Sequence, residues 1–111
     1  MLLIAPPVYD FALFDLFLKP YSLLSLGKAF EKGGYRVKCI NSLDYTDAAS
    51  RKELGIPLRH SNGTGKFFRQ LVGKPPVFSH IRRHYARYGV INRVLEQKIG
   101  EEKPDLVLVS T

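Results

Sequence analysis

The segment "HIRRHYARYG" (residues 80–89) holds the residues whose types most suggest chemistry. It places Arg82, Arg83 and Arg87 among two tyrosines and two histidines. Guanidinium groups bind phosphate and carboxylate through paired hydrogen bonds, and tyrosine rings can stack on the bases of RNA. The segment is therefore interpreted in three ways: as the exposed side of a helix, as an anion or phosphate site, or as an RNA-binding surface.

Helical spacing favours the first two interpretations. Ile81, Tyr85 and Tyr88 fall on one face of a helix, which predicts that the tyrosines pack inward and that the arginines lie at the surface. Tyrosines at core spacing are poorly placed to stack on bases. We therefore expect an anion, or a further part of a longer protein, rather than RNA as the partner of Arg82, Arg83 and Arg87.

The segment "SNGTGKFF" (residues 61–68) resembles a phosphate-binding P-loop only in part. His60 stands where the motif needs its first glycine, and Phe67 stands where it needs Ser or Thr. A glycine turn that presents Lys66 explains the pattern better, and its backbone amides could form a small anion nest. The predicted anion-binding residues are thus Lys66, Arg82, Arg83 and Arg87.

No metal site and no catalytic residue is predicted. His80 and His84 have the spacing of two ligands on a helix, but no Glu follows His80, and the neighbouring arginines would repel a cation. No Ser-His-Asp or paired-carboxylate arrangement has a motif around it. Cys39, the only cysteine, is interpreted as a small buried hydrophobic residue.

The positive charge is concentrated in one part of the chain. The formal net charge is +7, and residues 66–100 contain eight basic residues against the single acidic Glu96. The rest of the chain is balanced. This uneven distribution indicates an anionic partner more strongly than the total charge does.

The elements that would position these residues are typical of an α/β domain of 111 residues. "LLIA" (residues 2–5) is predicted to be a buried strand that Pro6 and Pro7 stop. Helical spacing over 21–32 ends at two glycines, and alternation over 35–40 predicts a second strand. Strand, helix and strand make a βαβ unit.

The second half of the chain is less regular. Glycines and prolines break residues 45–79, which we expect to form one long irregular loop, with aromatic residues that argue against disorder. A helical pattern over 80–100, with a break at Gly89, leads to "DLVLVST" (residues 105–111), a predicted buried strand.

The predicted architecture is a single three-layer α/β domain, Rossmann-like or flavodoxin-like, with a parallel sheet of strand order 2-1-3. Ligands bind such sheets at the carboxyl ends of the strands. The candidate cofactor-binding residues are therefore Pro6, Pro7, Ser110 and Thr111, where a phosphorylated ligand would also bind. A last strand that is apolar on both faces, with no covering helix after it, suggests an incomplete domain.

The compartment is predicted from what the sequence lacks. No apolar run reaches the roughly 20 residues that a membrane-spanning helix needs, and the first ten residues carry no secretory pattern. The solitary cysteine suits a reducing environment. We expect a cytoplasmic location and no membrane partner.

Three motifs in order, "GTGKF", "IRRHYARYG" and "KPDLVLVST", resemble the amino-terminal region of radical S-adenosylmethionine (radical SAM) proteins that carry a cobalamin-binding-like domain. The segments "LLIAPP" and "YSLLSLGKAFEKGGYRVKCINSLD" are similar to the first βαβ unit of that domain. The resemblance covers most of the chain. It implies that further α/β units and a separate radical SAM barrel follow these residues.

The resemblance also implies a role. The chain would be an accessory domain that is structural or that positions substrate or cofactor, with the downstream radical SAM domain as its partner. The cluster motif CxxxCxxC and the cobalamin motif DxHxxG are both absent. We therefore expect no cofactor in this segment, with the iron-sulfur cluster and S-adenosylmethionine held only by the downstream part.

Overall fold

The structure, a computed structural model, describes residues 1–110. The chain divides into two compact units, each assembled from separated segments. The parallel-sheet unit contains Met1–Pro6, Leu18–Ser42 and the segment that begins at Ile91. The antiparallel-sheet unit contains Pro7–Phe17 and Leu43–Val90.

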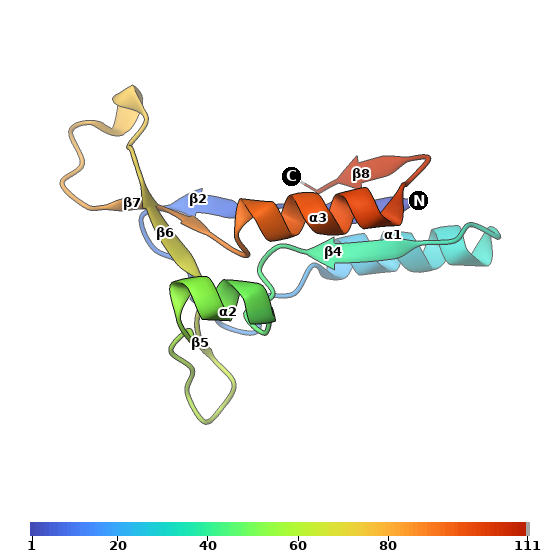
Figure 1. The fold of residues 1–111 in the computed structure, drawn as a ribbon, viewed down its shortest axis with the longest axis horizontal. Coiled ribbons are helices and arrows are strands. Elements are labelled where there is room, and N and C mark those ends of the chain that lie inside the picture. The colour runs from blue at the N-terminus through green and yellow to red at the C-terminus, as the bar shows by residue number, and fades with distance from the viewer. Residues whose placement is uncertain (111) are drawn as a thin grey trace. The chain divides into compact units, whose positions relative to one another are not determined.

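The parallel-sheet unit is built on three strands in the order β4-β1-β8; Figure 1 labels the two outer strands, β4 and β8. The strands are β1 (Leu2–Ala5), β4 (Lys38–Asn41) and β8 (Val107–Val109). Both neighbours run parallel to β1, so that Leu3 aligns with Cys39 on one side and with Leu108 on the other. The prediction of a mixed α/β fold with a parallel sheet is confirmed.

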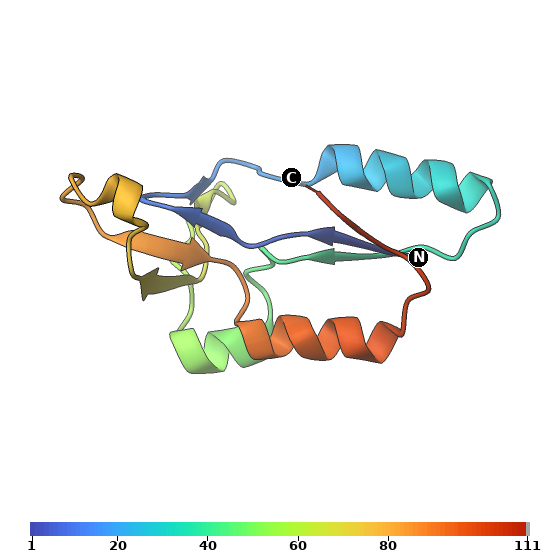
Figure 2. The same ribbon diagram turned by 90° about the horizontal axis from the view of Figure 1, so that it is seen from above.

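The central strand β1 is buried on both faces, because a helix covers each face (Figure 2). Apolar side chains therefore point to both sides of this strand. Leu2 and Ile4 form a buried cluster with Ile40, and Leu95 and Ile99 pack against it from α3 (Asn92–Glu102). Leu3 faces the other helix, α1 (Tyr21–Lys32), where a Cβ atom added at Gly27 would lie 2.9 Å from Leu3 Cδ1. The unit therefore has three layers.

The helix predicted over 21–32 is confirmed, with the same bounds. The helix ends at Lys32, directly before two glycines. The Gly33 amide donates to Ala29 O, and Gly34 adopts a φ of +89°, which residues with a side chain rarely adopt. No helix within residues 1–110 is long and apolar enough to cross a membrane.

Strand β8 is less buried than its sequence predicts. Its residues are apolar throughout, yet Val107 and Val109 are 40% and 58% exposed. The reason is topological, because β8 pairs only with β1 among the described residues and forms an edge of the sheet.

The antiparallel-sheet unit has a three-stranded sheet in the order β2-β7-β6 and a two-stranded sheet of β3 and β5. Phe67, Ala86 and Tyr88 form its buried cluster, with Leu13 and other apolar side chains against it. The strands are β2 (Val8–Asp10), β3 (Phe14–Asp15), β5 (Gly65–Lys66), β6 (Arg69–Val72) and β7 (Tyr85–Tyr88).

Residues 45–79 differ from the predicted irregular loop, because regular elements occur within them. Besides β5 and β6, they contain helix α2 (Ala48–Leu54) and the 3-10 turn η1 (Pro76–Phe78). The Asp47 carboxylate caps α2 by accepting a hydrogen bond of 2.8 Å from the Ser50 amide. Short elements between glycines and prolines leave too little periodicity to be predicted.

The predicted helix over 80–100 is wrong in its first half. Residues 85–88 form strand β7, the centre of the antiparallel sheet, and α3 begins only at Asn92. Tyr85 and Tyr88 match helical spacing by coincidence. The true period is two, since Ala86 and Tyr88 share one face of β7 and Tyr85 and Arg87 the other.

Candidate functional site

Of the predicted cofactor-binding residues, Pro6 and Ser110 lie at the carboxyl-end edge of the parallel sheet. Pro6 and Pro7 follow β1 directly, and Ser110 follows β8, where its amide donates to Ile4 O at 2.9 Å. Thr111 lies outside the described residues. Pro7 belongs to the antiparallel-sheet unit by its contacts, whereas Pro6 and Ser110 belong to the parallel-sheet unit.

Ser42 adds a polar group at this edge that the sequence did not indicate. Its amide donates to Ala5 O at 2.9 Å, so Ser42 continues β4 beside the end of β1. The residue is fully buried, and its hydroxyl oxygen has no hydrogen-bond partner within residues 1–110. A buried serine after a strand carries no sequence signal that separates it from other serines.

A cavity of about 460 Å³ lies between the start of α1 and the end of β8. Its wall combines apolar side chains with two serines and contains no charged group; the lining residues are Ser22, Leu23, Leu26, Leu108, Val109 and Ser110. Such a wall offers no cation to a phosphate group.

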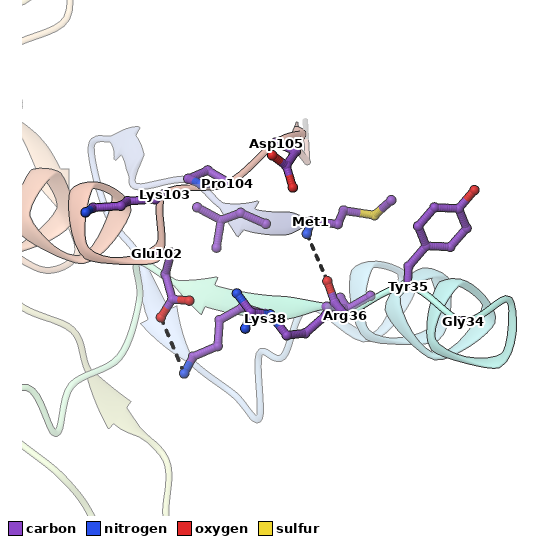
Figure 3. A pocket seen from close by; sticks show the side chains of 11 residues that line it. Met1, Gly34, Tyr35, Arg36, Lys38, Glu102, Lys103, Pro104 and Asp105 are labelled. Atoms are coloured by element: carbon purple, nitrogen blue, oxygen red, sulfur yellow. Dashed lines mark hydrogen bonds and ion pairs between the residues drawn. The ribbon is translucent and has the colours of Figure 1, made fainter.

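Another cavity, of about 540 Å³, opens at the opposite, amino-terminal edge of the parallel sheet (Figure 3). Two interactions of charged groups cross this cavity. The Met1 ammonium donates to Arg36 O at 2.8 Å, and the Lys38 ammonium lies 3.4 Å from a Glu102 carboxylate oxygen. Ligands of open parallel sheets bind at the other edge, and no nucleophile or acid-base pair stands out here.

The backbone at Gly65–Lys66 lies close against the backbone at Leu58–Arg59. The Lys66 amide donates to Leu58 O, and a Cβ atom added at Gly65 would collide with that oxygen. Gly65 is thus needed because the chain at Leu58–Arg59 lies against it. Lys66 lies on strand β5, and the turn that precedes it contains residues 61–63, with Gly63 at a φ of +88°.

The neighbouring carboxylate is already engaged. Asp15, opposite Gly65 in the β3–β5 pair, is buried, and its carboxylate oxygen lies 2.6 Å from Arg59 Nη2. The Arg59 guanidinium also donates to Gly63 O and lies 3.6 Å above the Tyr45 ring. Asp15 is therefore held by Arg59 and does not neutralise Lys66.

Lys66 and Arg83 line the same cavity, of about 370 Å³, which we call the cationic cavity. A third cation, Arg69, lies in its wall, although the sequence did not single it out. The lining residues are Phe11, Ala12, Leu13, Phe14, Lys66, Phe67, Arg69, Arg83 and Tyr88. All belong to the antiparallel-sheet unit.

The other two predicted cations do not line this cavity. Arg82 is exposed beside Arg83. Arg87, expected at the surface of a helix, is instead 3% exposed on strand β7, because it lies on the central strand of the sheet. Its Nη1 donates to Val90 O at 2.7 Å, while Nε and Nη2 have no partner within residues 1–110.

The two tyrosines of the opening segment are packed, as the sequence predicts, although on a strand. Tyr85 lies within 5.2 Å of Phe11 and 6.1 Å of Phe78, measured between ring centroids, and Tyr88 is 4% exposed. Little ring surface is left for stacking on RNA bases.

Metal-ligating groups do not gather in the described chain. His60, His80 and His84 are exposed, and His80 and His84 precede β7 without forming a helix face. Within residues 1–110 no group of three His, Cys, Asp or Glu side chains is placed to hold an ion. Cys39 is half-buried on β4, and its desolvation raises the pKa of the thiol.

Comparison with protein-family models, with curated proteins and with solved structures found no match to this chain.

Proposed function

We propose that this chain is an amino-terminal accessory domain of a radical SAM protein and that it positions substrate or cofactor without performing catalysis itself. The observation that carries the proposal is the sheet β4-β1-β8, parallel throughout and covered by α1 and α3 on opposite faces. The resemblance implies this arrangement for a cobalamin-binding-like domain. In that class the sheet is Rossmann-like or flavodoxin-like, and β1 and β4 with α1 form its first βαβ unit.

The exposed edge of the sheet at β8 is where we expect the partner to bind. Val107 and Val109 of β8 expose apolar side chains, and the outer edge of β8 has no neighbouring strand among residues 1–110. Apolar edge strands are usually covered in stable proteins. In the proposal, further α/β units and the downstream radical SAM domain of the same cytoplasmic protein supply this cover.

The residues do not fit a cobalamin or a four-iron cluster within this segment. The three histidines are exposed residues of the antiparallel-sheet unit, and none stands in a DxHxxG motif. A single cysteine cannot supply the thiolate ligands that an iron-sulfur cluster needs. Radical chemistry would therefore belong to the downstream part of the protein.

Reading the gene beyond codon 111 tests the proposal. We expect the reading frame to continue through further α/β units to a CxxxCxxC motif, whose cysteines bind the cluster. A stop codon at that point, or a continued frame without the cysteine motif, would contradict the proposal.

Neither alternative function gains an observation of equal weight. The RNA-binding alternative depends on stacking by the tyrosines of residues 80–89, and Tyr85 and Tyr88 are packed. A phosphorylated ligand near Pro7 and Thr111 needs a cation, and the cavity that Ser110 lines has none in its wall.

A further inference from the structure

The cationic cavity combines positive charge with aromatic walls in a pattern that the parallel-sheet proposal does not use. We propose that it binds a small phosphorylated ligand carrying a planar ring, of the class of a nucleoside monophosphate. Lys66, Arg69 and Arg83 would bind the phosphate, and the exposed ring of Phe14 would stack on the planar group.

Two strand pairs build the cavity wall in the same way. Lys66 of β5 aligns with Phe14 of β3, and its ammonium lies 5.8 Å from the centre of the Phe14 ring. Arg69 of β6 aligns with Tyr88 of β7. Residues aligned across an antiparallel pair place their side chains on the same face. Each pair thus contributes one cation and one aromatic ring to the cavity.

The cations of the cavity are not neutralised by the protein. Within residues 1–110, neither Lys66, Arg69 nor Arg83 forms an ion pair, and no carboxylate lines the cavity. The nearest acidic residue along β3, Asp15, is bound by Arg59. Three like charges in one wall repel one another, and a phosphate dianion relieves that repulsion while accepting paired hydrogen bonds from the guanidinium groups.

The aromatic residues differ in exposure in a way that suits a planar ring. Phe67 and Tyr88 are 5% and 4% exposed and form a fixed floor, whereas Phe14 is 56% exposed and presents its ring to the ligand. The volume of about 370 Å³ falls in the range of small-molecule pockets. A small ligand therefore fits better than a nucleic-acid strand, which tracks along an open groove.

Titration of the full chain with inorganic phosphate, adenosine and adenosine monophosphate, followed by calorimetry, tests the proposal. We expect the nucleotide to bind at least about tenfold more tightly than either part alone, because it uses the cations and the ring together. Arg83→Gln should weaken nucleotide binding about tenfold, the effect of losing one charge-assisted contact. Phe14→Leu should weaken nucleotide binding while leaving phosphate binding unchanged.

Arg82→Gln is the matched control. It removes the same charge one residue away, and Arg82 is exposed outside the cavity wall, so nucleotide affinity should change less than about twofold. Three results would overturn the proposal: no nucleotide binding at about 1 mM, equal weakening by Arg82→Gln and Arg83→Gln, or an affinity for oligoribonucleotides that exceeds that for the nucleotide and grows with their length. The reading frame beyond codon 111 does not affect any of these outcomes.

Discussion

Arg59 joins several segments of the antiparallel-sheet unit through one side chain. Its guanidinium contacts the Asp15 carboxylate, the Gly63 carbonyl and the Tyr45 ring. Arg59→Met keeps much of the side-chain volume but takes the cation away from a carboxylate that is 3% exposed. We expect a loss of about 3 kcal/mol in the free energy of unfolding, measured by urea denaturation.

Two variants separate the ion pair from general charge effects. Arg82→Gln removes an exposed arginine of the same unit and should change the free energy of unfolding by less than about 0.5 kcal/mol. Arg59→Lys keeps the positive charge but loses the planar guanidinium group that contacts both the Asp15 carboxylate and the Gly63 carbonyl. It should therefore retain only part of the stability that Arg59→Met loses. An Arg59→Met protein as stable as the parent would show that the pair contributes nothing to stability.

Cys39 should titrate at a higher pH in the folded chain than in the unfolded chain. Burial disfavours the thiolate and raises the pKa of the thiol, and only the thiolate reacts with disulfide reagents. At a fixed pH near 8 the folded chain should react more slowly than the chain in urea. Stopped-flow measurement of the rate against pH, in buffer and in urea, gives both midpoints.

The sign of this shift has a consequence for stability. Because the folded state holds the thiol proton more tightly, the contribution of Cys39 is complete below the pKa of the unfolded thiol and declines as pH rises above it. A folded-state midpoint at or below the midpoint in urea would contradict the assignment of Cys39 as a desolvated thiol. Cys39→Ser identifies the background rate.

Residue types alone identified part of the candidate site. Lys66 and Arg83 could be selected because a glycine turn and an arginine cluster are local patterns. Arg69 could not, because its place in the cavity depends on the alignment of β6 with Tyr88 of a strand that the helical spacing concealed. Asp15 and Arg59 are 44 residues apart, and nothing local indicates that they meet.

At the scale of elements, two helical glycines should respond oppositely to alanine. Alanine at Gly100 of α3 meets no atom within 4 Å, so the protein should gain up to about 1 kcal/mol from helix propensity. Alanine at Gly27 of α1 brings its Cβ within 2.9 Å of the buried Leu3 side chain. Overpacking of this kind costs about 1–3 kcal/mol.

Thermal and urea denaturation of both variants give the comparison. Gly100→Ala should be more stable than the parent, and Gly27→Ala should be less stable. If Gly27→Ala were as stabilising as Gly100→Ala, then α1 would not pack against β1 as closely as the structure has it.

The outer edge of β8 should be visible in amide hydrogen exchange. The Ser110 amide donates toward β1, to Ile4 O, so by alternation the amide of Leu108 points the same way and those of Val107 and Val109 point outward. For the 111-residue chain by itself, we expect the outward amides to exchange at least about tenfold faster than those of Leu108 and Ser110. Equal protection of all four would mean that another strand covers this edge, in a second copy or in another segment.

Elements with a long, uninterrupted pattern could be predicted, and elements with a short one could not. Helix α1 has twelve residues of clear periodicity between Pro20 and two glycines, and its predicted bounds match. Strand β7 has four residues, and Ile81, Tyr85 and Tyr88 happen to satisfy helical spacing as well. Only the pairing of β7 with β2 and β6 decides between the two periods.

At the scale of the whole chain, the sequence indicated an α/β fold with a parallel sheet but no antiparallel sheet. The parallel strands are apolar runs, which are recognised one at a time. The antiparallel-sheet unit depends on pairing between residues 7–17 and 43–90, which lie on either side of helix α1 in the chain. Its strands have two to four residues, so their pairing, and not their composition, defines them.

The two units have separate hydrophobic clusters. We therefore expect a large-to-small substitution in one cluster to destabilise its own unit and to leave the other unit unchanged. Phe67 belongs to the cluster of the antiparallel-sheet unit, and Leu2 to that of the parallel-sheet unit. Phe67→Ala should cost about 3–5 kcal/mol locally. Amide exchange should then accelerate at Ala86 and Tyr88 while the amides of Leu3 and Ile4 keep their protection.

Leu2→Ala provides the reciprocal experiment. Its cavity lies among Ile4, Ile40 and the side chains of α3, so exchange should accelerate at Leu3 and Ile4 and stay unchanged at Ala86 and Tyr88. Because the chain passes back and forth between the units, the opposite outcome has a clear meaning. If either substitution accelerated exchange equally in both units, the chain would unfold as one cooperative body, and the separation of the clusters would have no energetic counterpart.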